Sequence, residues 1–421
     1  MILKIRIKAL LVALLCFSSI AAFAYNGVRL TSSTLVATHT VEQLKQKFKE
    51  KKIPSFLVKL EFDVEVYEIL YQTQLPNGAP VMASGLYFVP KGAKGNLPVI
   101  VYHHGTQVEK HRESGVLYGE QAICTSYSTT GYTVIMPDYI GLGKGEGMHM
   151  YLHAESEAQA SIDMIRAVRE FNKTINVATR ADLFITGYSQ GGHAAMSLHK
   201  IIEEKFANEF TVLASAPMSG AYDMDGVQSE VMFHPYSFQG YLPYLIYSYN
   251  RVYNIYDDPN KVFKAPYDTS LAPMFDGTHT LFETNDIMPS IPKDAMIDSL
   301  VDSYVNNPND PFKLRLRENS VANWKPNAPM QMCYCKGDKQ VVHENALVAQ
   351  ANMKKLGAKN IKALMVDKKL GHRTCAMFAA IHTKMYFDSF LKGSKTGRKG
   401  SIIKRGLMSI AKKQVRKKAT N

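Results

Sequence analysis

The sequence predicts an α/β fold in which an eight-stranded, mostly parallel sheet is flanked by helices and carries a helical cap insertion. Between residues 60 and 390, short β-rich runs alternate with helical stretches, which is the pattern of βαβ units. Six of the runs are continuously apolar, as expected of parallel strands covered on both faces. The chain has 421 residues, 46% of them hydrophobic, enough for a large core. This composition excludes a disordered or fibrous protein.

Residues 1–24 have the pattern of a cleavable signal peptide. A basic start is followed by an apolar run from Ala9 to about Phe23 and by small residues at Ala22 and Ala24. The run is short and no stop-transfer flank follows, which disfavours an uncleaved anchor. We therefore expect an exported protein, periplasmic or secreted, whose mature chain begins near Tyr25.

The strands are predicted from eight runs. Residues 62–74 and 80–90 form an antiparallel pair joined by the turn Pro76-Asn77-Gly78. The six buried parallel strands are predicted at Pro98–Tyr102, Thr133–Pro137, Asp182–Thr186, Thr211–Ser215, Pro329–Cys335 and Ile361–Val366. These runs place the main α/β domain in a first part, 25–223, and a second part, 327–392.

Helices are expected between most of these runs, for example at 153–171 and 190–206. The interval 224–326 has no strand of the buried type but is dense in aromatic residues. Because a structureless loop of this length is improbable, we interpret it as a helical cap, or lid, over the carboxyl edge of the sheet. A separate domain is the competing interpretation, disfavoured because the sheet pattern resumes afterwards.

The net charge of +13 belongs mainly to a tail, 393–421, rather than to the folded body. From Lys392 to Asn421 there are eleven Lys and Arg residues and no acidic residue, and the body itself is close to neutral. Ile403, Leu407, Ile410 and Ala411 would share one face of a helix. The tail is thus either a basic amphipathic helix that docks on an anionic membrane or envelope surface, or a solvated tail. Nucleic acid is not an expected partner.

Four cysteines follow the signal segment, and export permits disulfides among them. They are Cys124, Cys333, Cys335 and Cys375. Sequence alone does not give the connectivity, but Cys333 and Cys335 lie two apart on one predicted strand, point the same way and would strain to pair with each other. Buried thiols are as reasonable an interpretation as any bridge.

Gly187-Tyr188-Ser189-Gln190-Gly191 is a G-x-S-x-G pentapeptide between a predicted strand and a predicted helix. The motif by itself is weak, but this strand-turn-helix setting is the one that a nucleophile elbow requires. The elbow holds a serine hydroxyl out at the top of the sheet, and glycines let neighbouring chain come close. Ser189 is therefore the candidate nucleophile.

A serine hydroxyl needs a base and an orienting acid. His372 is the candidate base, in a loop after the last predicted strand and before a helix predicted at 376–390. His382 falls inside that helix. Asp338 follows an earlier strand and is the candidate acid, with Glu344 as its rival. The order Ser, Asp, His is the one used by α/β hydrolases.

The oxyanion hole is predicted at two backbone N–H groups. The helix start supplies that of Gln190, and the loop Tyr102-His103-His104-Gly105-Thr106 supplies that of Thr106. His103 and His104 have no carboxylate partners at suitable spacing, so they are poor evidence for a metal site. We expect neither a metal nor a cofactor.

Several motifs in register resemble the secretory lipase family of α/β hydrolases, found in fungi and bacteria. The likeness covers about residues 60 to 390, apart from much of the cap. The matching stretches are Tyr102-His103-His104-Gly105-Thr106, Pro137-Asp138-Tyr139-Ile140-Gly141-Leu142-Gly143, Met150-Tyr151-Leu152, Gly187-Tyr188-Ser189-Gln190-Gly191-Gly192, Asn323-Trp324-Lys325-Pro326 with Pro329, and Gly337-Asp338. The resemblance implies a lipase or esterase with a helical lid, and a triad of Ser189, Asp338 and His372.

The sequence thus predicts an exported serine hydrolase that cleaves small-molecule or lipid esters through an acyl-enzyme intermediate. A serine peptidase on the same fold is the second hypothesis, since one triad serves both reactions. A non-catalytic envelope-binding protein that kept the fold is the third. The aromatic cap favours an apolar acyl or alkyl group.

Overall fold

The computed structural model describes residues 29–50, 59–111, 113–397, 406 and 412 of the chain. The predicted signal peptide and nearly all of the predicted tail lie outside the described residues. Among the helices that the structure describes, none is long and apolar enough to cross a membrane.

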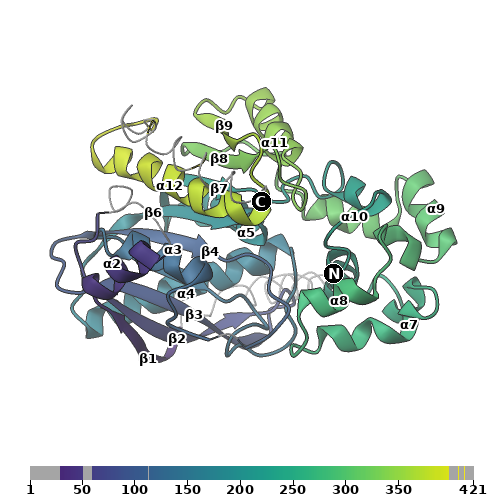
Figure 1. The fold of residues 1–421 in the computed structure, drawn as a ribbon, viewed down its shortest axis with the longest axis horizontal. Coiled ribbons are helices and arrows are strands. Elements are labelled where there is room, and N and C mark those ends of the chain that lie inside the picture. The colour runs from purple at the N-terminus through teal and green to yellow at the C-terminus, as the bar shows by residue number, and fades with distance from the viewer. Residues whose placement is uncertain (1–28, 51–58, 112, 398–405, 407–411, 413–421) are drawn as a thin grey trace, which may run out of the picture.

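One mixed, mostly parallel sheet of nine strands forms the centre of the molecule (Figure 1). Its order is β1-β2-β3-β5-β4-β6-β7-β8-β9. The six strands from β5 to β9 in this order run parallel to one another, whereas β1, β2, β3 and β5 pair antiparallel in succession. The strands are β1 (Leu30–His39), β2 (Val64–Gln74), β3 (Pro80–Pro90), β4 (Leu97–His103), β5 (Thr133–Pro137), β6 (Thr179–Tyr188), β7 (Thr211–Met218), β8 (Met330–Cys335) and β9 (Ile361–Asp367).

Helices cover both faces of the sheet, which explains its continuously apolar strands. One face packs against α3 (Gly119–Ser128) and α12 (His372–Leu391). The other packs against α4 (Ala154–Thr174), α5 (Gln190–Lys205) and α11 (Glu344–Lys355). A short helix, α2 (Val41–Glu50), contacts α12 through Phe48 and Ile381. We call this sheet with its helices the body.

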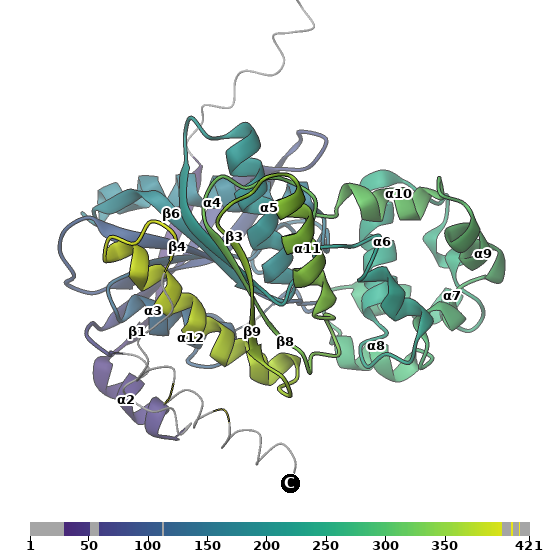
Figure 2. The same cartoon turned by 90° about the horizontal axis from the view of Figure 1, so that it is seen from above.

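A helical lobe, which we call the cap, lies between β7 and β8 and projects to the right of the body in Figures 1 and 2. Its elements are η2 (Ser229–Phe233), α6 (Tyr241–Tyr253), η3 (Pro259–Val262), α7 (Tyr267–Ser270), η4 (Ala272–Phe275), α8 (Leu281–Ile287), η5 (Pro292–Ala295), α9 (Asp298–Asn306) and α10 (Pro311–Glu318). Its apolar cluster continues into the body at Val108, Tyr151 and Leu152. Since these helices fall within 224–326, we propose those limits for the insertion.

The fold class is confirmed, with one more strand than predicted. The additional strand is β1, which pairs with β2 at the sheet edge and has mostly exposed or half-exposed side chains. Such a polar edge strand lacks the apolar run on which the strand prediction depends. The eight predicted strands correspond to β2 through β9.

Parallel pairing brings the ends of several strands to one edge of the sheet. His103 at the end of β4 is in register with Gly187 of β6, and Met218 of β7 is in register with Cys333 of β8. The chain leaves β4 toward β5 on one side, while β6 pairs with β4 on the other. Ligands of open α/β sheets bind at such a switch point, outside the carboxyl ends of the strands.

Candidate active site

Ser189 occupies the turn between β6 and α5 in a backbone conformation that is rare for a side-chain-bearing residue. Its φ is 62° and its ψ is −122°. The conformation is held from both sides, because the Ser189 N–H donates to the Met218 carbonyl at 3.0 Å and its own carbonyl accepts from the Gly192 N–H at 2.8 Å. Strain of this kind persists where the surroundings over-determine it, as at functional sites.

The glycines of the pentapeptide are required by close backbone packing. A Cβ on Gly187 would overlap the Gly191 carbonyl, and one on Gly191 would overlap the His103 carbonyl. These contacts join the elbow directly to the end of β4, where the second oxyanion donor is predicted. A side chain at either position would separate the two loops.

Asp338 and His372 are in contact. Asp338 Oδ2 lies 2.6 Å from His372 Nδ1, and both residues are buried. Asp338 Oδ1 accepts from the backbone N–H groups of Gln340 and Val341, at 2.9 and 3.0 Å. With the carboxylate fixed in this way, it accepts the Nδ1–H of His372 and leaves Nε2 free to take a proton.

His372 is the first residue of α12, so the prediction that it lies in a loop before the helix is wrong in this detail. The helix begins four residues earlier than expected at Ala376, directly after Gly371. The His372 carbonyl accepts from the Tyr188 hydroxyl at 2.6 Å. The base is therefore anchored to the residue that precedes the candidate nucleophile.

A disulfide joins the segments that carry these two residues. Cys335 at the end of β8 is bonded to Cys375 in the first turn of α12, with a Cα–Cα distance of 6.0 Å. Asp338 follows the first of these cysteines closely, and His372 precedes the second. Cys124 and Cys333 are buried and do not take part in this bridge. The bridge thus ties the acid segment to the base segment.

Ser189 and His372 line one groove, together with Thr106, Tyr188 and Gln340. No hydrogen bond joins Ser189 Oγ to His372 Nε2 among the residues that the structure describes. Such contacts are often long without substrate and tighten in the reacting complex. The pairing of nucleophile and base therefore stays a prediction.

The second predicted oxyanion donor, Thr106, lines the same groove, and a half-buried carboxylate supports its loop. Glu120 accepts from the Gly105 N–H at 2.8 Å and from the Tyr102 hydroxyl at 2.9 Å. Thr106 Oγ1 lies 3.2 Å from the Tyr151 hydroxyl. The Thr106 N–H donates to none of the residues that the structure describes, and its role as an oxyanion donor stays a prediction.

His103 and His104 act in packing. The ring of His103 lies between the Thr186 carbonyl and the Ser161 hydroxyl, at 3.1 and 2.9 Å, and burial lowers its pKa to about 4. His104 contacts backbone oxygens. Across the described parts of the chain, no group of three or more His, Cys, Asp or Glu side chains could hold a metal ion.

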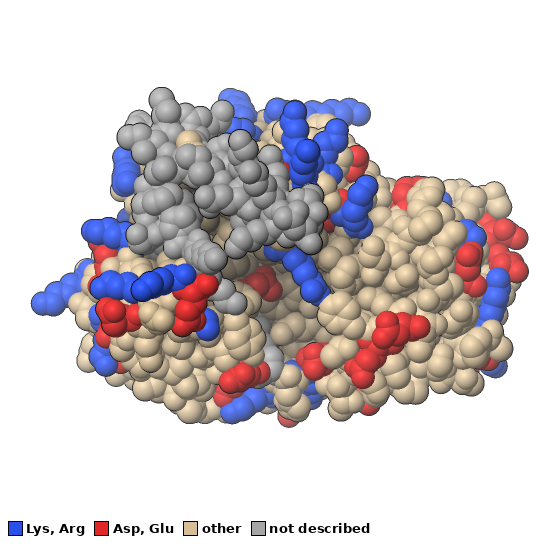
Figure 3. All heavy atoms as spheres, in the orientation of Figure 1, with Lys and Arg blue, Asp and Glu red and all other residues tan. Residues whose placement is uncertain are grey.

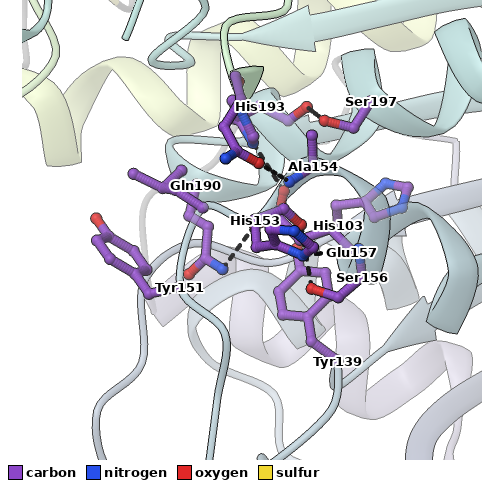
Figure 4. Close-up of polar contacts among 12 residues, drawn as sticks. His103, Tyr139, Tyr151, His153, Ala154, Ser156, Glu157, Gln190, His193 and Ser197 are labelled. Carbon is purple, nitrogen blue, oxygen red and sulfur yellow. Dashed lines mark hydrogen bonds and ion pairs between the residues drawn. The ribbon is translucent and has the colours of Figure 1, made fainter. Parts of the chain in front are cut away.

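Sequence reasoning missed a buried polar network behind the elbow (Figure 4). Glu157 of α4 is fully buried; its Oε1 accepts from Gln190 Nε2 at 2.9 Å, and its Oε2 lies 2.7 Å from His193 Nδ1. His193 Nε2 lies 2.8 Å from the Asn319 carbonyl. The signal that could have indicated this network is weak: Glu157 is an acidic residue beside the small residue Ala158 in a segment predicted to be helical.

Two depressions in the surface are both lined by Ser189, and we call them the apolar cavity and the open groove. The apolar cavity extends under the cap and has no charged residue in its lining, which includes Leu242, Phe312 and Leu316. The open groove runs between α3, α12 and the cap, and its lining includes charged side chains. Figure 3 shows the surface hollowed between the body and the cap.

The sequence matches the profile of the family described as secretory lipase over residues 114–393. No curated protein matches it by sequence. Among solved structures, a putative hydrolase from Legionella pneumophila is similar, with 25% identity, 87% of this chain and 99% of that chain covered, and a TM-score of 0.81.

Other similar structures have names that specify an activity. A mutant of the rice cell wall degrading esterase LipA from Xanthomonas oryzae shares 27% identity, with 86% of this chain and 98% of that chain covered, and a TM-score of 0.77. Candida antarctica lipase A, at 14% identity, covers 91% of this chain and 85% of that chain with a TM-score of 0.66, and supports the fold alone. The chain belongs to the secretory lipase family of α/β hydrolases and is a carboxylic ester hydrolase, and membership of this family indicates export.

Proposed function

We propose that this ester hydrolase works through Ser189, His372 and Asp338 as a catalytic triad. Ser189 Oγ attacks the ester carbonyl while His372 Nε2 takes its proton, and Asp338 stabilises the imidazolium that forms. The backbone N–H groups of Thr106 and Gln190 hold the oxyanion. His372 returns the proton to the departing alcohol, and water then hydrolyses the acyl-enzyme by the same steps in reverse.

The observation that carries this proposal is the 2.6 Å contact between Asp338 Oδ2 and His372 Nδ1 in a groove that Ser189 also lines. A buried carboxylate that accepts two backbone N–H bonds and one imidazole is an orienting acid rather than a surface ion pair. The positive φ of Ser189 adds the strained backbone expected of an elbow.

Labelling with a fluorophosphonate tests the triad. The wild-type enzyme is expected to be labelled, and Ser189→Ala is expected to take up no label while unfolding at the same temperature. Ser197→Ala is a matched control, because this buried hydroxyl bonds within α5. A folded wild-type chain that stays unlabelled would refute the triad and favour a non-catalytic binding protein.

The lining of the two depressions supports a division of the ester between them. The uncharged, apolar cavity suits an acyl chain, and the open groove with its charged rim suits the alcohol. Activity on acyl p-nitrophenyl esters without activity on aminoacyl anilides is expected. The reverse result would identify a peptidase.

We further propose that residues 1–24 are removed on export to the periplasm or the exterior, and that the basic tail binds an anionic membrane or envelope surface. Mass spectrometry of the secreted chain should give a mature start near Tyr25. Sedimentation with vesicles containing phosphatidylglycerol should lose binding when Lys413, Arg416 and Lys417 are changed to Glu in the full chain. Unchanged binding would leave a solvated tail.

A further inference from the structure

The side chain of Gln190 is held in one orientation by two acceptors. Its Nε2 lies 2.9 Å from Glu157 Oε1 and 2.7 Å from His149 Nε2. His149 Nδ1 lies 3.1 Å from the Ile140 carbonyl, which can only accept, so Nδ1 carries the ring proton and Nε2 is the acceptor. Burial lowers the pKa of His149, in agreement with a neutral ring. Both amide hydrogens of Gln190 are therefore used.

The amide cannot be turned over, because its oxygen would then face a carboxylate and an unprotonated ring nitrogen. Glu157 is itself held at its other oxygen by His193, which lies 2.8 Å from the Asn319 carbonyl. The network therefore fixes which way Gln190 Oε1 points. In Figure 4 the amide nitrogen points toward Glu157 and the oxygen toward the side where Tyr151 lies.

Gln190 Oε1 is a buried acceptor on a residue that lines the apolar cavity. Gln190 is 2% exposed, and this oxygen has no hydrogen-bond partner among the described residues. Gln190, Ser189 and Tyr151 all line the apolar cavity. A buried acceptor without a partner is costly, and such groups in native proteins call for an explanation. A donor supplied by the substrate would satisfy it.

We propose that Gln190 Oε1 accepts a hydrogen bond from a hydroxyl on the second or third carbon of the acyl group, so that the enzyme prefers esters of hydroxy acids. This inference rests on the proposed function. The donor belongs to the acyl group because Gln190 follows Ser189 and lines the cap-side cavity, not the open groove. It is a hydroxyl rather than an ammonium group because the cavity lining has no carboxylate to balance a charge.

Methyl esters of matched acids test the preference. Methyl 3-methylhexanoate has nearly the shape of methyl 3-hydroxyhexanoate without the donor, and the 2-hydroxy and 2-methyl esters form a second pair. Each enantiomer is assayed separately. At least one hydroxy ester should exceed its methyl counterpart in kcat/KM by about three- to tenfold, the effect of one net hydrogen bond.

The variant Gln190→Met should bring this ratio to about one, whatever happens to the absolute rates. Gln228→Met is the matched control: Gln228 lines the same cavity, but its amide bonds to Gln340 and Asn345, so the ratio should persist. Glu157→Met removes one of the two acceptors of the Gln190 amide and should also lower the ratio, which gives a second readout if the first variant does not fold.

A wild-type ratio of one at both positions, with hydrolysis still dependent on Ser189, would overturn the inference and leave the hydrolase intact. A ratio that survives Gln190→Met in the folded enzyme would overturn the role of this oxygen. Absence of any Ser189-dependent ester hydrolysis would overturn both the inference and the proposed function.

Discussion

The catalytic edge of the body and the cap are built by different interactions. At the edge, buried polar groups are fixed by directional bonds, as Asp338 is by His372 and two backbone N–H groups. The cap is rich in aromatic contacts: Tyr244 stacks on Tyr151 of the body at 4.6 Å and on Phe275 within the cap at 5.1 Å. Directional bonds fix atoms, whereas ring contacts tolerate adjustment. The difference suggests that the body sets the chemistry and the cap sets the choice of acyl group.

The largest effect is expected from Asp338→Asn. The amide would donate to His372 Nδ1 and stabilise the wrong tautomer, so kcat should fall by roughly 10³ to 10⁴. Asp286→Asn, at an exposed cap position, is the control and should leave kcat unchanged. Steady-state kinetics on a p-nitrophenyl ester measures both. A loss of less than tenfold would mean that Asp338 is not the orienting acid.

Replacing a glycine by alanine is expected to cost more unfolding free energy at the elbow of the body than in the cap. Gly191→Ala would drive a Cβ into the His103 backbone, which is part of β4 and cannot move aside. A loss of about 3 kcal/mol or more in the free energy of unfolding is expected. At Gly240 in the cap, a Cβ would approach the side chains of Leu281 and Thr284 at 3.0 Å, and Gly240→Ala should cost about 1 kcal/mol or less. Urea unfolding gives both values.

Removal of the disulfide should weaken the edge while leaving the cap in place. The double variant Cys335→Ser, Cys375→Ser is expected to lose about 2–4 kcal/mol of unfolding free energy. A reducing agent should destabilise the wild type and leave this variant unaffected, as measured by thermal unfolding. Equal responses of the two proteins would contradict the bridge.

Acid should destabilise the body through buried histidine. Burial lowers the pKa of His103 from the ordinary 6.5 to about 4 in the folded protein, so the unfolded chain binds more protons between these values. This contribution is complete above pH 6.5 and is lost as the pH falls toward 4, on the order of 3 kcal/mol. In His103→Gln, the fall in unfolding free energy between pH 7 and 4.5 should be smaller. An unchanged slope would contradict a neutral buried ring.

The smallest effect concerns the cap. Val231 lines the apolar cavity, so Val231→Phe should shorten the preferred acyl chain and change the ratio of kcat/KM for octanoate and butanoate esters by about tenfold or less. Val305→Phe, on an exposed part of the cap that lines neither depression, is the matched control. Identical ratios in the two variants would show that the acyl chain does not enter the cavity.

Continuous apolar patterns made the interior of the fold predictable. The ranges predicted for β3 and β5 coincide with the observed Pro80–Pro90 and Thr133–Pro137. β1 was missed because an edge strand needs no apolar face, and the start of α12 was misplaced because the polar segment around His372 reads as a loop. Motif and chain order were enough to nominate the triad candidates.

Contacts between distant segments could not be predicted. The bridge from Cys335 to Cys375 depends on how β8 lies beside α12, which spacing along the chain does not specify. The contacts of Glu157 could not be predicted either, because its partners Gln190 and His193 come from another helix. The disulfide and the contacts of Glu157 both depend on how helices and strands pack in three dimensions, whereas the sequence pattern predicts only which helices and strands are present.

The position of the Cys335–Cys375 bridge also bears on when the enzyme becomes fully assembled. Thiols remain reduced in the cytosol and pair in oxidising surroundings. A newly made chain still inside the cell would thus lack the covalent tie between its acid and base segments, and would gain it only after leaving. The disulfide-bonded hydrolase would then be present only outside the cytosol, away from esters inside the producing cell.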